Sequence, residues 1–279
     1  MTDPVSGAAQ RIDYGVNWNA PWLAPIRRLG EQVAGAPDWR VELNLRAAQL
    51  NIRNHAGLPL SFVLQEDLPS GVSYEAHIGA TGNVPTRSNL HDFFNALVWL
   101  TFPRIKVELN ALQAAQIAQL GIGKSRGPAR DAATLFDENA AFLVVVDNAA
   151  GHSLVDALRS HQWQDVFVAR RAQFQAQVGV FLFGHAMMEK LVNPYKAITA
   201  HSLVCWVEAD FQSLSDVQKL ARLDVTMARQ LDRAQGGIEL LPSVFSPLPV
   251  LGVPTWWHDQ NAEFYADQEV FRPMRLRKS

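Results

Sequence analysis

The stretch AFLVVV, Ala141–Val146, decides the fold class. Six consecutive apolar residues that end in three valines are typical of a strand buried on both faces. Ile198–Val207 predicts a second strand, while Leu60–Leu68 and Val72–Ala80, joined by the turn residues LPSG, predict a hairpin. These strands do not alternate regularly with helices. We therefore predict an α+β fold, mostly helical, with a small mixed or antiparallel sheet.

Helical patterns fill most of the remaining sequence. Pro103 ends one helix and starts the next, because proline suits a first helical turn. Ser88 or Asn89 can cap the earlier of these two helices. We expect helices near Trp22–Val33, near Trp39–Arg53, and at Leu90–Thr101, Pro103–Leu120, Ser153–His161, Val166–Val192 and Ser215–Arg233.

Apolar residues at helical spacing predict the buried faces of two of these helices. The first face consists of Val41, Leu45, Ala48 and Ile52, and the second of Val217, Leu220, Leu223 and Met227. Two later segments carry no such pattern. We predict that the proline-rich residues 240–254 are irregular and that the aromatic end of the chain, Thr255–Ser279, packs along the surface.

The composition predicts one folded unit. The chain has 279 residues, of which 48% are hydrophobic, and it includes eight Trp and fourteen Phe, which is enough apolar material for a substantial core. A composition change that would mark a linker between domains is not visible. We predict an irregular N-terminal segment over residues 1–20 and a single globular domain over residues 21–279.

Charge and cysteine content exclude several classes of protein. The formal net charge is -2, and no long Lys/Arg run occurs, so a broad nucleic-acid surface is not expected. No run of about 18 apolar residues predicts a membrane span. The single cysteine, Cys205, excludes an intrachain disulfide. Because the first residues also lack a signal-peptide pattern, we expect a cytoplasmic location.

Three polar residues interrupt the apolar helix predicted at Leu90–Thr101. His91, Asp92 and Asn95 share one stripe of that helix, so a ligand-binding or catalytic stripe is one interpretation. Helix capping is the alternative for Asp92, because an acidic residue in the first turn stabilises the helix dipole. Capping does not explain His91. We assign Asn95 and the preceding Arg87 to substrate binding.

A second polar pair lies in VGVFLFGHAMMEKL, Val178–Leu191. His185 and Glu189 are four residues apart, so on a helix they share one face. Two ligands could then converge on a metal ion, or the carboxylate could orient the imidazole. Gly184 would allow close approach of another backbone or a ligand. The alternative is a His–Glu hydrogen bond within the core.

Charged residues also gather just before the buried strand. RGPARDAATLFDEN, residues 126–139, is predicted to be a loop, and loops that enter rigid strands often carry functional side chains. Its arginines could bind an anion. The alternative is an ordinary solvated loop. His201, in the second predicted strand, could supply a further nitrogen ligand to a metal, although an ordinary core or surface histidine is the preferred interpretation.

Five segments together resemble an uncharacterised bacterial family, the domain of unknown function 3025. They are VPTRSNLHDFFNALVWLTFPRIK, RGPARDAATLFDEN, FGHAMMEKLVNP, ITAH and LPVLGVPTWW with FYADQEVFRP. They occur in this order and cover most of residues 70–273. The resemblance implies a bacterial cytosolic protein and assigns no role to any residue.

Three functions fit these observations. The first is a metal-assisted hydrolase that acts on a small anionic molecule such as a phosphate ester. The second is acid–base chemistry without a metal, and the third is a non-enzymatic binding or scaffold protein whose buried polar groups are structural. Our candidate catalytic residues are His91, Asp92, Asp137, Glu138, His185 and Glu189. Our candidate substrate-binding residues are Arg87, Asn95, Arg126, Arg130 and Asp131. A divalent metal would be bound by His91, His185, Glu189 and His201.

Overall fold

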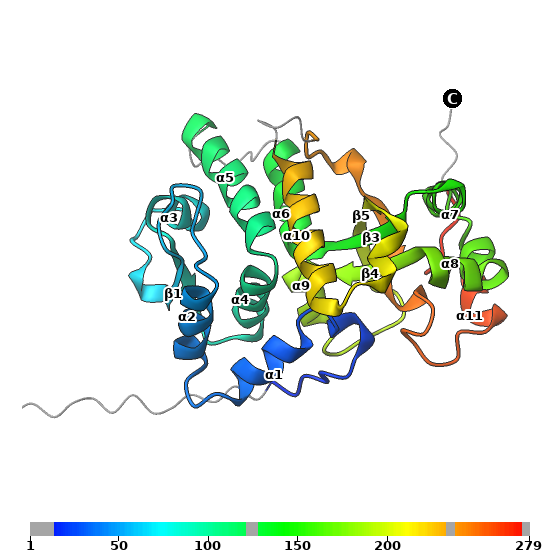
Figure 1. Ribbon diagram of the computed structural model, residues 1–279, viewed down its shortest axis with the longest axis horizontal. Helices are drawn as coiled ribbons and strands as arrows, with labels where there is room; N and C mark the ends of the chain where they lie inside the picture. The colour runs from blue at the N-terminus through cyan, green and yellow to red at the C-terminus, as the bar shows by residue number, and fades with distance from the viewer. Residues whose placement is uncertain (1–13, 121–127, 233–237, 275–279) are drawn as a thin grey trace, which may run out of the picture.

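The computed structural model describes residues 14–120, 128–232 and 238–274. A four-stranded sheet and its helices occupy one side of the molecule, and a smaller part with a two-stranded sheet occupies the other (Figure 1). The helices α4 (Leu90–Thr101) and α5 (Pro103–Leu120) lie between them. The fold is therefore α+β and mostly helical, as predicted.

The larger sheet has the strand order β4-β3-β5-β6. Its strands are β3 (Ala140–Val146), β4 (Val178–Leu182), β5 (Thr199–Val207) and β6 (Ser246–Pro249). Strand β3 pairs in parallel with β5 and antiparallel with β4, and β6 pairs antiparallel with β5, so the sheet is mixed. Every residue of β3 is buried, which confirms AFLVVV as a central strand.

Strand β6 corrects the prediction that residues 240–254 are irregular. The strand contains Pro247 and Pro249, and it is tolerated there because β6 lies at the edge of the sheet, where only one side must supply N–H donors. Two short 3-10 turns, η6 (Pro242–Val244) and η7 (Val250–Gly252), flank it.

The predicted hairpin is wrong. Strand β1 (Ser61–Leu64) is followed by the 3-10 turn η2 (Gln65–Asp67) and helix α3 (Tyr74–Thr81), and β1 pairs in parallel with β2 (Asn83–Thr86). Local capping explains the helix. The Ser73 hydroxyl accepts a hydrogen bond from the Ala76 N–H, and Gly82 ends α3 with a φ of 76°.

The first helices bury a different face from the one predicted. Pro25 separates the 3-10 turn η1 (Pro21–Leu23) from α1 (Arg27–Gly35), and α2 (Trp39–Gln49) follows. Helix α2 buries Trp39 and Leu43, whereas Val41, Leu45 and Ala48 of the predicted face are exposed to solvent. Ile52, the fourth member of that face, lies beyond the end of the helix and is buried, as predicted. The ring of Trp39 packs edge-on against Phe93 of α4, with 5.9 Å between the ring centroids. An aromatic contact therefore decides the orientation of the helix.

The segment before β3 is a helix and not the predicted loop. Helix α6 (Pro128–Asn139) begins at a proline, which suits a first turn, and leads directly into β3. Helix α7 (Ala149–Arg159) follows β3. Its cap is Asn148, which accepts a hydrogen bond from the Gly151 N–H and lies five residues before Ser153, the predicted start and cap.

The long helix predicted over Val166–Val192 is four elements. They are the π-helical turn η3 (Asp165–Ala169), α8 (Arg171–Gln177), β4 and α9 (His185–Lys190). The apolar sequence of β4 fits a strand beside β3 as well as it fits a buried helix, and periodicity alone does not separate the two. Gly184 joins the strand to α9.

The last helices confirm most of their predictions. After the 3-10 turn η4 (Ala209–Ser213), α10 (Asp216–Leu231) starts with a capping box formed by Ser215 and Gln218. Leu223 and Met227 are buried, but Val217 is exposed. Near the end, α11 (Ala262–Ala266) buries Tyr265, whose hydroxyl donates a hydrogen bond to the Gly252 carbonyl. The aromatic segment is thus part of the core at this point.

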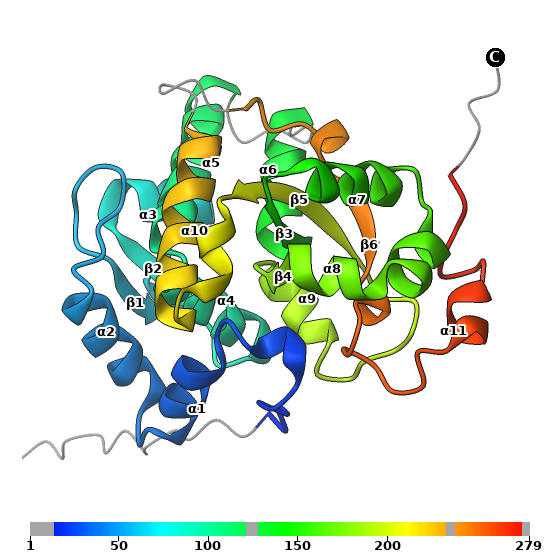
Figure 2. The same ribbon diagram turned by 45° about the vertical axis from the view of Figure 1, so that its right-hand side comes forward.

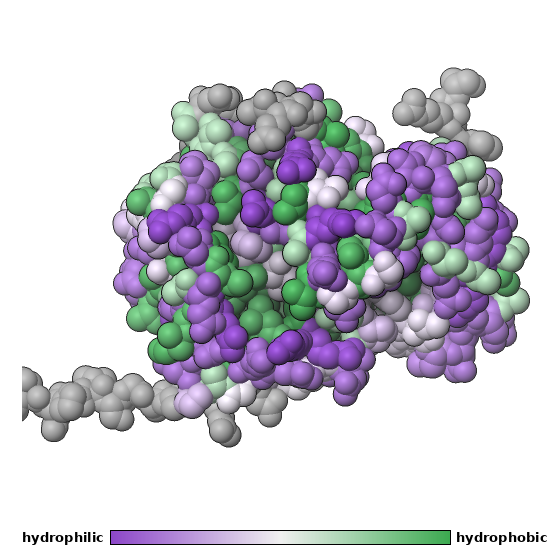
Figure 3. Space-filling view, viewed as in Figure 1, coloured by the Kyte–Doolittle hydropathy of each residue, from purple (hydrophilic) through white to green (hydrophobic). Residues whose placement is uncertain are grey.

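One hydrophobic cluster connects the two sides of the molecule, from Ala20 to Phe271. Phe136, Phe142 and Phe183 form its aromatic centre, with ring centroids between 5.0 and 5.7 Å apart. On the face seen in Figure 3, hydrophobic and hydrophilic residues are interspersed. Among the described helices, none has the length and apolar character that a membrane span needs.

Candidate functional site

A cavity of about 440 Å³ lies where five helices meet. Helices α4 and α9 are neighbours in both ribbon views (Figures 1 and 2), and α3, α5 and α6 complete the walls. The lining side chains are almost all polar. They are Gln65, Leu68, Ser73, Tyr74, Glu75, Arg87, His91, Asp92, Asn95, Gln113, Arg130, Thr134, Asp137, Glu138 and His185.

His91 stands in the first turn of α4, which is capped by the Asn89 side chain. Its Nδ1 atom lies 2.9 Å from Glu189 Oε2. Glu189 therefore contacts His91 and does not contact His185, contrary to the pairing that the spacing within one helix predicts. The pair is half-exposed, with side-chain exposures of 35% for His91 and 40% for Glu189.

His185 faces His91 across the cavity wall, and their Nε2 atoms lie 3.1 Å apart. Gly184 lets the start of α9 pack closely against the end of α6, because a Cβ atom there would lie 2.5 Å from the Glu138 carbonyl oxygen and 2.6 Å from the Ala140 nitrogen. The predicted convergence of the two histidines is therefore present. The other ring nitrogen, His185 Nδ1, is buried, lies 3.9 Å from Asp137 Oδ2 and has no hydrogen-bond partner among the described residues.

The protonation of the histidine pair follows from these contacts. Burial lowers the pKa of His185 to about 4, so this ring is neutral at neutral pH. His91 Nδ1 faces a carboxylate and is best occupied by a proton, which leaves His91 Nε2 as an acceptor. By the same argument, the Asp137 carboxylate beside His185 Nδ1 favours the single proton of that ring on Nδ1, so the Nε2 lone pairs of the two rings face each other.

A buried ion pair extends the polar chain behind the histidines. Lys106 Nζ lies 2.5 Å from Asp137 Oδ1 and 2.8 Å from Asn95 Oδ1, and Asn95 Nδ2 donates to the Tyr74 hydroxyl. Burial alone would raise the pKa of Asp137, but the charge of Lys106 and its hydrogen bond outweigh burial and lower it. Asp137 is therefore an anion held between Lys106 and His185.

Our predictions missed a sequence signal for the buried polar residues that α5 contributes to this network of hydrogen bonds. Lys106, Asn110 and Gln113 are buried polar residues at positions i, i+4 and i+7 of α5. This spacing places them on one face of the helix. A polar stripe within a largely buried helix is the pattern that singled out His91 on α4.

Glu75 is a second functional candidate that the sequence did not reveal. The segment was predicted to be a strand, but α3 directs Glu75 into the cavity, where its Oε2 accepts a hydrogen bond of 2.6 Å from Asn110 Nδ2. Burial, and then the charge of Asp137, raise the pKa of Glu75 to about 7. Two carboxyl groups in one cavity thus have pKa values shifted in opposite directions.

Asp92 forms a hydrogen-bonded ion pair with Arg87. The Nε and one terminal nitrogen of Arg87 each lie 3.0 Å from one oxygen of Asp92, and the Arg87 backbone N–H donates to the same carboxylate at 2.7 Å. Such a bidentate pair fixes both side chains. Asp92 therefore orders the start of α4, and its partner Arg87 is already neutralised at the cavity mouth.

The other predicted residues have three different outcomes. Asn95, Arg130, Asp137 and Glu138 line the cavity, and the Arg130 guanidinium has no carboxylate within 4.0 Å in the described part of the chain. Asp131 is exposed and does not line it. Arg126 lies outside the described residues.

The predicted four-residue metal set is not assembled. His201 lies on β5 opposite Ala140 and does not line the cavity, and Glu189 faces the Nδ1 side of His91. Among residues 14–120, 128–232 and 238–274, no three His, Cys, Asp or Glu side chains form a group that could hold a metal ion. The two Nε2 atoms of His91 and His185 are the nitrogens that could share one.

The comparison with known families agrees with the resemblance noted in the sequence. Residues 60–275 match the family described as a protein of unknown function, DUF3025, and the chain belongs to this family. Searches of the curated proteins and of the solved structures found no match. Function must therefore be argued from the cavity itself.

Proposed function

We propose that the cavity is the active site of a hydrolase that cleaves a small anionic ester, such as a phosphate ester, by acid–base catalysis. One observation carries the proposal: His91 and His185 face each other at 3.1 Å, and a carboxylate lies beside the outer nitrogen of each ring. A histidine oriented by a carboxylate is a recurring arrangement for proton transfer.

The pair can act as a base that removes a proton from water. The proton is held between the two Nε2 atoms, so one water O–H bond breaks, one N–H bond forms and the hydroxide attacks the ester. The positive charge that this places on the pair is offset by Glu189 beside His91 Nδ1 and by Asp137 beside His185 Nδ1. His91 is partly exposed, so the proton can then pass from it to solvent.

Glu75 and Arg130 complete the proposed site. Glu75 is protonated for part of the time at neutral pH because its pKa is about 7, so it can donate a proton to the leaving group. Arg130 lines the same cavity and can bind the anionic group of the substrate in bidentate fashion. Base, acid and anion-binding group therefore face one volume of about 440 Å³.

A metal-assisted version of the same reaction is the second candidate. It is favoured by the two inward-facing Nε2 atoms, since carboxylates on the outer nitrogens of metal-bound histidines commonly fix the ring orientation. Such an ion would have two protein ligands, and water and substrate would fill its other positions.

Hydrolysis of p-nitrophenyl phosphate, together with metal analysis of the purified protein, tests these versions. We expect turnover in the absence of added metal and in the presence of a chelator, and a loss of about a hundredfold or more in His185→Gln. His258→Gln is the control, because His258 is exposed and pairs with Asp259 away from the cavity. Stoichiometric metal and chelator sensitivity would instead support the metal-assisted version. If neither this ester nor an alkyl phosphate is hydrolysed while the fold is intact, the polar chain is structural and the proposal fails.

A further inference from the structure

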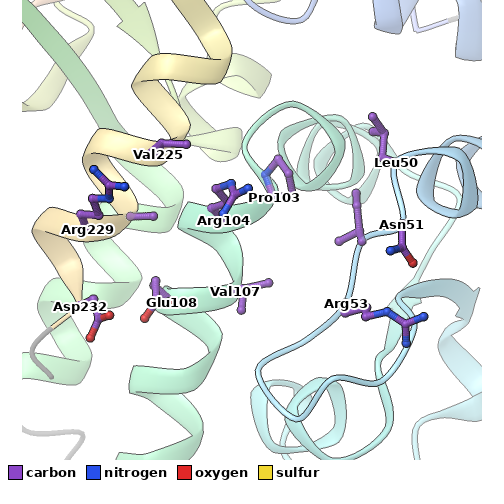
Figure 4. A pocket seen from close by; sticks show the side chains of 12 residues that line it. Leu50, Asn51, Arg53, Pro103, Arg104, Val107, Glu108, Val225, Arg229 and Asp232 are labelled. Carbon is purple, nitrogen blue, oxygen red and sulfur yellow. The ribbon is translucent and has the colours of Figure 1, made fainter. Parts of the chain in front are cut away.

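Two cavities outside the proposed hydrolase site differ in their lining. The cavity of about 560 Å³ beside α5 has many charged side chains, among them Arg104 and Glu108 (Figure 4). The cavity of about 320 Å³ beside β4 is lined mainly by apolar and aromatic residues. A ligand cavity with few polar groups selects its ligand through the positions of those groups. We therefore consider the polar groups of the second cavity one by one.

This cavity lies along the outer edge of the four-stranded sheet. It is lined by Gly179, Val180 and Phe181, three successive residues of β4. Successive side chains of a strand point to opposite faces of a sheet, so a cavity over one face would contact only alternate residues. Since β4 is an outer strand, the cavity lies at the side of β4 that faces away from β3.

The pairing with β3 determines which backbone groups face this cavity. The Phe183 N–H donates to the Ala140 carbonyl, and these two residues lie opposite each other in the register of the two strands. Backbone groups in an antiparallel pair point alternately toward and away from the partner strand. The groups of Phe181 and Gly179 therefore point toward β3, and the N–H and C=O of Val180 point away from it.

These two backbone groups of Val180 have no hydrogen-bond partner on the cavity side in the described part of the chain. The turn η1 packs beside β4, but Pro21 and Pro25, which line the cavity, have no N–H to donate. Val178, the preceding residue that faces outward, already donates its N–H to the Phe174 carbonyl. Within the cavity, the edge therefore offers one donor and one acceptor on a single residue, which suits a small molecule better than an added strand.

Aromatic side chains surround this edge. Phe181 and Phe211 pack edge to face, with 6.3 Å between their ring centroids, and Trp256 is half-buried beside the same cavity. Leu220 of α10 adds an aliphatic surface. Flat rings pack favourably against such side chains.

The charges at this cavity cancel. Asp216 and Lys219 line it from the start of α10, three residues apart and therefore on one side of that helix. Among the described residues, no other charged side chain lines the cavity. A neutral ligand is therefore favoured, because a charged ligand would lose its hydration without gaining an opposite net charge.

We propose that this cavity binds a neutral, flat nitrogen heterocycle of about two fused rings, in which an N–H donor lies next to a ring-nitrogen acceptor. The ring nitrogen accepts a hydrogen bond from the Val180 N–H, and the ligand N–H donates to the Val180 carbonyl. Neutral purine bases belong to this chemical class. The cavity volume is at the small end of the range for ligand sites, which suits two rings.

Three probes of nearly the same shape test the two hydrogen bonds. They are 7-azaindole, which has both groups, indole, which lacks the acceptor, and 1-methyl-7-azaindole, which lacks the donor. Binding is followed by chemical-shift titration of the intact protein. We expect 7-azaindole to bind about fivefold more tightly than the other two probes, because each of those leaves one polar group of Val180 unpaired. Equal binding of the three probes, or no saturable binding of 7-azaindole, would overturn the proposal.

The variant Val180→Pro removes the donor and keeps the pairing with β3, because proline is tolerated where the N–H faces away from the sheet. It should lose the preference for 7-azaindole over indole, and a retained preference would contradict the proposal. Melting temperatures show whether the variant folds. If it does not fold, the comparison of 7-azaindole with its methyl derivative on the wild type decides.

A second variant tests the apolar wall. Leu220→Ala should weaken binding of all three probes by about threefold or more and leave their order unchanged, since it removes apolar contact alone. Val217→Ala is the matched control, because Val217 lies on the same helix, is exposed and does not line the cavity. An equal loss of affinity in the two variants would show that the probes bind elsewhere.

Discussion

Glu75 and Asp137 illustrate how the environment of a residue decides its chemistry. Both are carboxyl groups on one cavity, but Lys106 lies against Asp137 and lowers its pKa, whereas burial and Asp137 raise the pKa of Glu75 to about 7. A pair of acids with separated pKa values can supply a proton donor and an anion in one site at neutral pH. The pH dependence of the reaction rate should therefore identify Glu75, the proposed acid.

The first prediction concerns the variant Glu75→Gln. An alkyl leaving group needs protonation, whereas p-nitrophenolate does not, so hydrolysis of β-glycerophosphate should fall about a hundredfold while p-nitrophenyl phosphate is little affected. In the wild type, the rate on β-glycerophosphate should decrease as the pH rises through about 7, because Glu75 loses its proton. Equal losses on the two substrates would contradict the assignment of Glu75 as the acid.

The same group gives a stability signature that needs no substrate. Because the pKa of Glu75 is raised in the folded state, its contribution to stability is present below the ordinary value of 4.5 and is lost as the pH rises towards and through about 7. Glu75→Gln cannot titrate. The melting temperature of the variant relative to the wild type should therefore increase between about pH 5 and about pH 8. A constant difference would show that Glu75 titrates normally.

Part of the site was predictable at the residue scale and part was not. His91 and His185 stood out because each is a polar residue in an apolar segment, and the structure brings their rings together. The partner of Glu189 was predicted incorrectly, since spacing within one helix cannot show that a side chain bonds to a neighbouring helix. Lys106 escaped notice because a lysine on a helix usually faces solvent.

At the scale of elements, the short connection between β4 and α9 sets the geometry of the histidine pair. Gly184 lies against the backbone where α6 passes into β3, with the Asn139 Cα only 2.6 Å from the position of an added Cβ. Backbone atoms cannot move aside for an added Cβ atom as the end of a flexible side chain can. The glycine thus fixes the distance between α9 and the end of α6, which carries Asp137.

The second prediction is that Gly184→Ala destabilises the protein by about 2 kcal/mol or more and disrupts the histidine pair, because the added methyl group must push α9 away. Gly35→Ala is the control, since a Cβ at Gly35 meets nothing within 4 Å. Denaturant unfolding measures the free-energy change, and histidine ring NMR signals report the pair. If Gly184→Ala behaves like Gly35→Ala, the backbone contact does not constrain α9.

Errors in the predicted elements share a physical cause. Val178–Leu182 and Tyr74–Thr81 were each assigned the wrong type because short apolar runs fit a strand and a buried helix equally well, and tertiary pairing decides between them. By contrast, β3, α4, α5 and α10 were predicted correctly, since they are long or strongly patterned or have clear caps. The short elements that went wrong are the ones that position Glu75 and His185.

At the scale of the whole molecule, the hydrophobic core includes residues that lie before the segment covered by the family match. The match begins at residue 60, but helix α2 lies before it and buries Trp39 against Phe93 of α4. One hydrophobic cluster includes Trp39, Phe93 and all of β3 except Val146. We therefore propose that the segment before the match folds with the rest as one cooperative unit, consistent with the single domain expected from the sequence.

The third prediction tests this unit with Trp39→Ala, which should cost about 3 kcal/mol or more because a fully buried indole is removed. If the protein unfolds as one cooperative unit, the free energy of unfolding also falls for the distant sheet, so amide hydrogen exchange of β3 should accelerate by roughly a hundredfold or more. Val41→Ala is the matched control, since Val41 lies on the same helix and is 55% exposed. Its effect on both stability and exchange should be small. If Trp39→Ala loosens α2 and α4 but leaves the protection of β3 unchanged, the two sides of the molecule unfold separately, and the cavity between them lies at a boundary between two folding units.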